Sequence, residues 1–124
     1  MNLDHRIAIV TGGGSGIGAA TADALAAAGA SVMVTDISEA SADSTANVIA
    51  QRGQSATALV QDVTSLEQWE QVFEATNQAF GVPNALVNNA GVSGAGQDRL
   101  EEPGGLDAWR LVMSVNIDAV HLGC

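Results

Sequence analysis

Four short apolar runs recur at nearly even intervals and constrain the fold of this chain most strongly. They cover residues 7–10, 32–34, 58–60 and 85–87. None of them alternates apolar with polar residues, which is typical of strands that are covered on both faces of a parallel sheet. The sequence therefore predicts four parallel strands separated by segments of helical length.

The segments between and after these runs carry apolar residues at helical spacing, so each is predicted to form a helix with one apolar stripe. The predicted stripes are Ile17, Thr21, Ala24, Leu25 and Ala28; Ala42, Ala46 and Ile49; Leu66, Trp69, Val72, Phe73 and Phe80; and Leu106, Trp109, Met113, Ile117 and Val120. Right-handed crossovers between the strands give a doubly wound α/β sheet of the Rossmann type, with helices on both faces. Because we find no linker and no repeat, residues 1–124 are expected to form a single domain or part of one.

Composition argues against several classes of protein. The formal net charge of −10 disfavours a nucleic acid or an anionic membrane as partner, and no apolar run approaches the ~20 residues that cross a bilayer. The single cysteine, Cys124, and an N-terminus without a signal-peptide pattern indicate the cytoplasm. We see no cluster with metal-ligand spacing, so no metal site is expected.

Residues 11–18 read Thr-Gly-Gly-Gly-Ser-Gly-Ile-Gly, between the first predicted strand and the first predicted helix. A helix N-terminus presents unpaired N–H groups and a partial positive charge, so an anion binds there readily. Gly12 suits a sharp turn, Gly16 the close approach of a phosphate, and Gly18 the tight packing of helix on strand. The alternative interpretation is a purely structural turn.

Asp36 stands just past the second predicted strand, eighteen residues after Gly18. An acidic residue at this place suits both hydroxyls of an adenosine ribose. A 2′-phosphate would instead meet a like charge, and neither Ser15 nor Ile37 supplies a cation to offset it. The sequence therefore predicts NAD rather than NADP as cofactor, with a solvated carboxylate at a strand end as the alternative.

Four motifs in register resemble the short-chain dehydrogenase/reductase family: residues 11–18, Asp62-Val63, residues 88–91 and Val115-Asn116. The resemblance implies that residues 12–17 cradle the pyrophosphate, that Asp62 and the Val63 amide take the adenine, and that Asn89 lines the nicotinamide side and braces the sheet. The implied cofactor-binding residues are Gly12, Gly14, Ser15, Gly16, Ile17, Gly18, Asp36, Ile37, Asp62, Val63, Asn89, Ala90 and Gly91. The alternatives are a helix cap for Asp62 and an ordinary turn for residues 88–91.

The same resemblance matches Asn116 to the asparagine of the family's proton relay; the alternative is a core amide bonded to a neighbouring backbone. The family's other catalytic residues are a serine and a Tyr-x-x-x-Lys pair, yet this sequence contains no tyrosine and no lysine. We do not expect Ser93, His5 or His121 to replace them. The expectation is a cofactor-binding portion of an NAD-dependent oxidoreductase for an alcohol or carbonyl group, lacking its catalytic half and inactive alone.

Three further expectations concern what lies beyond the cofactor. The strand at 85–87 would form a sheet edge, and such edges recruit other chains, so self-association is expected; relatives in the family are commonly dimers or tetramers. One alternative function is a non-catalytic dinucleotide-binding or interaction module, which a native stop after Cys124 would favour over a longer reading frame. Another is a Rossmann-like methyltransferase, for which the glycine loop and the acidic residue alone would suffice.

Overall fold

The computed structural model of the chain describes residues 2–91 and 105–124, without the side chains of residues 105, 106 and 108. Four strands, β1 (Ile7–Val10), β2 (Ser31–Asp36), β3 (Ala56–Val60) and β4 (Ala85–Val87), form one parallel sheet in the order β3-β2-β1-β4. The predicted parallel strands are confirmed. Because β2 and β4 lie on opposite sides of β1, the topology reverses there, as in a doubly wound fold of the Rossmann type.

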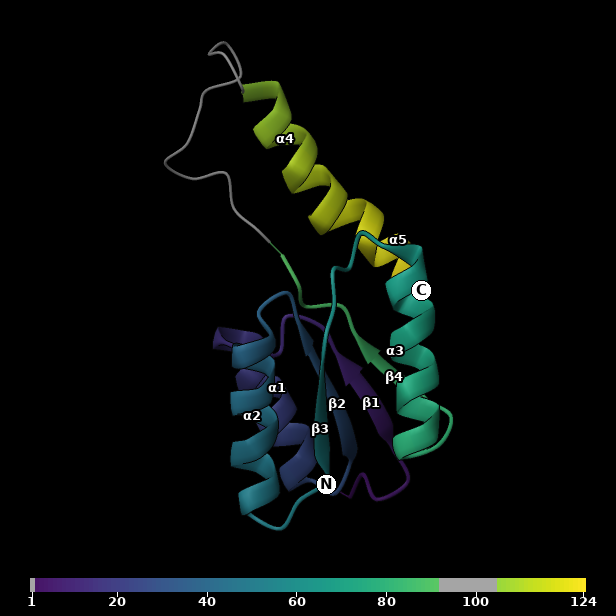
Figure 1. Cartoon of the computed structure of the whole chain (residues 1–124). Coiled ribbons are helices and arrows are strands. Elements are labelled where there is room, and N and C mark those ends of the chain that lie inside the picture. The colour runs from purple at the N-terminus through teal and green to yellow at the C-terminus, as the bar shows by residue number, and fades with distance from the viewer. Residues whose placement is uncertain (1, 92–104) are drawn as a thin grey trace.

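Helices cover both faces of the sheet, as predicted (Figure 1). On one face lie α1 (Gly16–Ala27) and α2 (Glu39–Gln51), and on the other lies α3 (Leu66–Ala79). After β4 come α4 (Gly105–Met113), the π-helical turn η1 (Ser114–Asp118) and α5 (Ala119–Gly123). In Figure 1, α5 lies beside α3, and α4 extends beyond the carboxyl ends of the strands.

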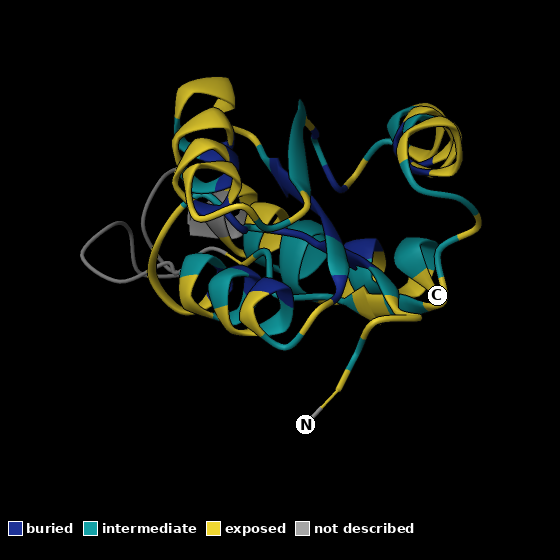
Figure 2. Ribbon diagram, turned by 90° about the horizontal axis from the view of Figure 1, so that it is seen from below, coloured by how far each residue is buried: buried dark blue, intermediate teal, exposed yellow. Residues whose placement is uncertain are grey.

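Two apolar cores hold the layers together, and Figure 2 shows buried strand residues between the helical layers. Between the sheet and the α1–α2 layer lie Val10, Ala22, Ala26, Ala30, Val32, Val34, Ala42, Ala46 and Ile49. On the other face, Ile9 and Met33 pack against Val72 of α3. All three residues of the stripe predicted for the second helix are buried, so this prediction is confirmed. The small alanine side chains allow α2 to lie close to the sheet.

The predicted stripe of the first helix is confirmed only in part: Leu25 packs against the core, but the fully buried residues differ from those predicted. Gly18, Ala22 and Ala26 are buried, whereas Ile17 is 79% exposed. The rotation of α1 is fixed at its start, where Gly18 packs directly against the carbonyl oxygen of Gly12. In α3 the prediction is confirmed for Trp69 and Val72 but not for Leu66 and Phe73, which are exposed.

The predicted stripe of the last helix is wrong at Trp109 and Ile117, whereas Met113 and Val120 are half-buried and the side chain of Leu106 lies outside the described residues. Trp109 and Ile117 are 49% and 56% exposed, and the side chains that pack against Trp69 are instead Val115, Ala119 and Leu122. A π-helical turn holds more residues than an α-helical turn, so η1 rotates the following residues away from a regular 3.6-residue pattern. Trp109 lies before η1, and its exposure shows that its place on the predicted apolar stripe is wrong.

Both edges of the described sheet are partly open to solvent. Leu86 of β4 is 36% exposed, and Val60 of β3 is 42% exposed. Self-association through the β4 edge stays a prediction. Among the described residues, no helix has both the length and the apolar character that crossing a bilayer requires.

Candidate functional site

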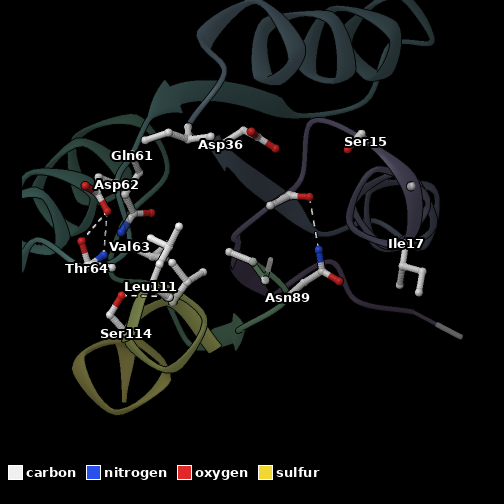
Figure 3. A pocket seen from close by; sticks show the side chains of 16 residues that line it. Ser15, Ile17, Asp36, Gln61, Asp62, Val63, Thr64, Asn89, Leu111 and Ser114 are labelled. Atoms are coloured by element: carbon white, nitrogen blue, oxygen red, sulfur yellow. Dashed lines mark hydrogen bonds between the residues drawn. The ribbon is translucent and has the colours of Figure 1, made fainter. Parts of the chain in front are cut away.

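A cleft of about 620 Å³ opens at the carboxyl ends of the strands, where the loops after β1, β2, β3 and β4 meet. In Figure 3, Ser15 and Ile17 stand across the cleft from Asp62, Val63 and Ser114, and Asp36 and Asn89 lie between the two groups. The lining residues are Gly12, Ser15, Gly16, Ile17, Asp36, Ile37, Gln61, Asp62, Val63, Thr64, Asn89, Ala90, Gly91, Leu111, Ser114 and Val115. The fold therefore brings together eleven of the thirteen predicted cofactor-binding residues.

The N-terminus of α1 borders this cleft. Ser15 is the N-cap residue, but its side chain makes no capping hydrogen bond, and the first turn of α1 contains no acidic residue. Gly16 has a φ of +53°, and a Cβ built on it would meet no atom within 4 Å. The loop thus leaves open space beside the positive end of a helix, and this arrangement fits a phosphate group.

Gly14 and Gly18, which were also predicted to bind the cofactor, do not line the cleft. A Cβ on Gly18 would lie 2.1 Å from the oxygen of Gly12 and 2.4 Å from Nδ2 of Asn89. Gly18 therefore allows α1 to pack against the loop, as its predicted packing role requires. The backbone amide of Gly14 instead contacts the side chain of Asp36.

The carboxylate of Asp36 is held by two backbone amides. Oδ2 accepts a hydrogen bond from the amide of Gly14 at 3.0 Å, and Oδ1 accepts one from the amide of Ser38 at 3.0 Å. A carboxylate accepts about four hydrogen bonds, so each oxygen keeps capacity for a ligand hydroxyl. The next residue, Ile37, is 70% exposed beside the cleft.

Asp62 lies on the opposite wall, in a turn of its own. Its Oδ1 accepts hydrogen bonds from the hydroxyl and the amide of Thr64, at 2.6 Å and 2.9 Å. The Thr64 hydroxyl, and then its amide, lower the pKa of Asp62, because both bonds favour the ionised carboxylate. The N-cap of α3 is Ser65, whose Oγ accepts from the amide of Gln68 at 3.2 Å. The interpretation of Asp62 as the cap of this helix is therefore wrong.

Trp69 of α3 holds the backbone of Val63 in place. The indole Nε1 of the buried Trp69 donates a hydrogen bond to the carbonyl oxygen of Val63 at 2.8 Å. The same indole packs against Ala119, so α3 and α5 together fix this wall of the cleft.

The loop after β4 is tied to the glycine loop. The buried hydroxyl oxygen of Thr11 accepts hydrogen bonds from the amides of Asn89 and Ala90, each at 3.1 Å. Nδ2 of Asn89 donates to the oxygen of Gly12 at 3.2 Å. The expected bracing by Asn89 is present in the structure, whereas its contact with a cofactor stays a prediction.

Asn116 lies half-buried in η1 and does not line the cleft. A Cβ built on Gly91 would be 3.2 Å from Oδ1 of Asn116, so its carboxamide stands directly behind the loop after β4. The catalytic role of Asn116 stays a prediction. His5 and His121 are exposed and lie outside the cleft, and Ser93 lies outside the described residues.

Five lining residues were not predicted: Gln61, Thr64, Leu111, Ser114 and Val115. Gln61 and Thr64 flank Asp62-Val63, and the other three share one helix face by their spacing, so a weak signal existed. Gln61 is buried; its Oε1 accepts from the Thr35 hydroxyl at 2.7 Å, and its Nε2 has no hydrogen-bond partner in the described structure. Within residues 2–91 and 105–124, no three His, Cys, Asp or Glu side chains gather as metal ligands would.

The sequence matches the short chain dehydrogenase family over residues 6–124. It is 43% identical over 115 residues to the "Probable oxidoreductase EphD" of Mycobacterium tuberculosis, which is 93% of this chain and 19% of that protein. It is 34% identical over 122 residues to the 3-beta-hydroxysteroid dehydrogenase of Comamonas testosteroni, and 36% identical over 126 residues to the NADP-dependent (R)-specific alcohol dehydrogenase of Lentilactobacillus kefiri. Each of these two matches covers 98% of this chain and 46% of the relative.

The chain thus spans less than half the length of each of these relatives. The match extends over nearly all of the sequence and includes the glycine loop, the loop after β4 and the last helix. It decides against the methyltransferase alternative. This protein belongs to the short chain dehydrogenase family, whose members are oxidoreductases that bind NAD or NADP.

Proposed function

We propose that this chain is the NAD-binding portion of an oxidoreductase that acts on an alcohol or carbonyl group. The observation that carries the proposal is the cleft itself, which is lined by both an uncapped helix N-terminus and Asp36. A dinucleotide combines an anionic pyrophosphate with a ribose diol, and these two features match its two groups.

The choice of NAD over NADP rests on Asp36. Family membership leaves the choice open, since one relative is named as NADP-dependent. The cleft contains the carboxylates of Asp36 and Asp62 but no lysine or arginine among its lining residues. A 2′-phosphate near Asp36 would be repelled without a compensating cation, whereas ribose hydroxyls would donate to the carboxylate.

The proposed contacts follow the walls of the cleft. Gly12, Ser15, Gly16 and Ile17 would hold the pyrophosphate, Asp36 and Ile37 the adenosine ribose, and Asp62 with Val63 the adenine. Asn89, Ala90 and Gly91 would lie beside the nicotinamide half. When bound, the nicotinamide supplies the hydride acceptor or donor; the residues named here bind and orient it.

Proton transfer is the part that this sequence does not supply. A general acid or base with a suitable pKa must serve the substrate oxygen, and the sequence contains neither tyrosine nor lysine. We propose that the 124-residue chain binds NAD without turning over substrate, and that Asn116 supports the proton relay of the whole enzyme. A non-catalytic dinucleotide-binding module remains the second candidate, favoured by the same composition.

The remaining parts of the proposal concern the protein as a whole. One sheet and its helices carry the cleft of the described residues, which supports a single, incomplete dinucleotide-binding domain over residues 1–124. The open β4 edge supports a homo-oligomer, and the lone cysteine supports a cytoplasmic location. The substrate of the whole enzyme would be a small molecule.

Calorimetric titration of the chain with NAD and with NADP tests the proposal. We expect NAD to bind and NADP to bind at least about tenfold more weakly. Asp36→Ala should lower NAD affinity about tenfold or more, since hydrogen bonds to charged groups are worth about 1.5–3 kcal/mol. Asp43→Ala removes an equal charge from the exposed face of α2 and should change nothing. Equal affinity for the two dinucleotides, or an unchanged Asp36→Ala, would overturn the assignment.

A further inference from the structure

The glycine loop contains one residue whose contacts point away from the cleft and toward the side chain that selects the cofactor. Gly14 does not line the cleft, and its amide donates to Oδ2 of Asp36 at 3.0 Å. The amide of Ser38 holds the other oxygen, Oδ1, at the same distance. One carboxylate oxygen is therefore bonded to the glycine loop and the other to the start of α2, so the orientation of Asp36 depends on both elements.

The position of Gly14 has no room for a side chain. A Cβ there would lie 2.6 Å from Cβ of Ser41, 2.9 Å from the carbonyl carbon of Ser41 and 2.8 Å from Oδ2 of Asp36. Gly16, two residues later, has open space in the same test. The two glycines therefore serve different purposes: Gly16 leaves space in the cleft, and Gly14 permits the loop to approach Asp36 and α2.

We propose that Gly14 is a positioning residue that sets the preference for NAD over NADP by fixing the Asp36 carboxylate. This inference rests on the proposed function and extends it. A carboxylate held by two amides has a fixed direction for its remaining lone pairs, so ribose hydroxyls meet them without a further loss of side-chain freedom. If the Asp36 carboxylate is displaced, it binds the ribose hydroxyls of NAD less well. It also repels the 2′-phosphate of NADP less, so the two affinities become more similar.

The test is a double-mutant cycle of Gly14→Ala and Asp36→Ala, read as the affinities for NAD and for NADP. In the wild-type background, Gly14→Ala should lower NAD affinity about tenfold, change NADP affinity less, and so reduce the NAD/NADP ratio. In the Asp36→Ala background, the same substitution should leave the ratio unchanged. An equal loss for both dinucleotides, or the same change in both backgrounds, would mean that Gly14 acts only on loop structure and would overturn the inference.

A second variant keeps the test decisive if Gly14→Ala does not fold. Adding Ser41→Gly removes the 2.6 Å contact with Cβ of Ser41 but leaves the contacts with its carbonyl carbon and with Asp36. The double variant therefore relieves part of the crowding and should still lose the NAD preference. Ser41→Gly alone is its control and should keep the preference.

Amide hydrogen exchange separates this inference from the proposed function. The amide of Gly13 donates to the Thr35 carbonyl at 2.9 Å, and that of Gly14 to Asp36. Asp36→Ala should therefore accelerate exchange at Gly14 about tenfold and leave Gly13 unchanged. If the wild-type chain binds neither dinucleotide, the proposed function fails, while the exchange result still decides whether Gly14 holds Asp36. Equal exchange at Gly14 in both proteins would overturn the positioning role.

Discussion

The helices α1 and α3 both begin after a serine, but only one of these serines caps its helix. In α3 the Oγ of Ser65 accepts from the amide of Gln68, and Glu67 places a negative charge in the first turn. In α1 the side chain of Ser15 makes no capping bond, and no acidic residue lies in the first turn. The first four amides of any helix have no partner within it, so the end of α1 keeps donors and positive charge for a group in the cleft.

Helix α2 resembles α3 in this respect. Its N-cap residue Ser38 accepts from the amide of Ser41 at 3.3 Å, and Glu39 stands in its first turn. Two of the three helices that pack on the sheet are thus stabilised at their N-termini by their own side chains. In α1 the start is instead fixed by Gly18, through its close approach to Gly12 and Asn89. Side chains cap the N-termini of α2 and α3, whereas the N-terminus of α1 stays available to a ligand.

Gly18→Ala should produce the largest effect, because α1 has close packing in place of a cap. The new Cβ would lie 2.1 Å from the oxygen of Gly12, so the helix must shift away from the loop. We expect the free energy of unfolding to fall by about 1–3 kcal/mol and calorimetric binding of NAD to be lost. Gly53→Ala is the control: its Cβ meets no atom within 4 Å, but its φ of +77° strains a side chain, so it should lose stability and still bind NAD. Wild-type NAD affinity in Gly18→Ala would contradict the packing account.

Ile17→Glu should separate stability from binding. Ile17 is 79% exposed in the first turn of α1, so an acidic residue there would add the charge that Glu67 gives to α3. The free energy of unfolding should rise by about 0.5 kcal/mol, whereas NAD affinity should fall about tenfold through repulsion of the pyrophosphate. The loss should shrink at high salt. Ile17→Gln provides the uncharged control; an equal loss in this variant would assign the effect to shape.

Ser65→Ala and Ser15→Ala compare the two serines directly. Loss of a capping side chain costs about 1 kcal/mol, so urea denaturation should show this decrease for Ser65→Ala with NAD affinity unchanged. Ser15→Ala should change the free energy of unfolding by less than about 0.5 kcal/mol and should weaken NAD binding. Equal costs of unfolding for the two variants would show that Ser15 does cap α1 and would remove the distinction.

The sequence predicted the scaffold well where a local pattern decides the structure. Buried parallel strands are continuously apolar, so all four strands were found, and the alanines of α2 pack as their spacing predicts. The orientations of α1 and of the last helix were predicted only in part, because they depend on the packing of Gly18 against Gly12 and on the π-helical turn η1. The first is a tertiary contact and the second is a change of hydrogen-bond register within a helix. Hydrophobic periodicity encodes neither.

The sequence motifs predicted which loops form the candidate site, but not which residues line the cleft and which hold other residues in place. The glycine loop, Asp36 and Asp62 lie around one cleft because the carboxyl ends of parallel strands meet at one edge. No sequence pattern indicated that Gly14 would contact Asp36 instead of the cleft. It also missed Leu111 and Ser114, since the topology brings the last helix to the cleft from far along the chain.

Asp62→Asn should give the smallest effect, and it tests the turn that precedes α3. The hydroxyl and the amide of Thr64 hold the pKa of Asp62 below its ordinary value. Because the pKa is lower in the folded state, the ionised carboxylate stabilises the protein above the unfolded-state pKa of about 3.9, and this contribution is lost as the pH falls through the folded-state pKa. The wild type should therefore be slightly more stable than Asp62→Asn to urea at pH 7, and the difference should shrink as the pH is lowered below about 3.9. Asp43→Asn, on the exposed face of α2, controls for the loss of one charge from an acidic chain. A difference that persists unchanged at low pH would mean that the shape of the Asp62 side chain, and not its charge, stabilises the turn.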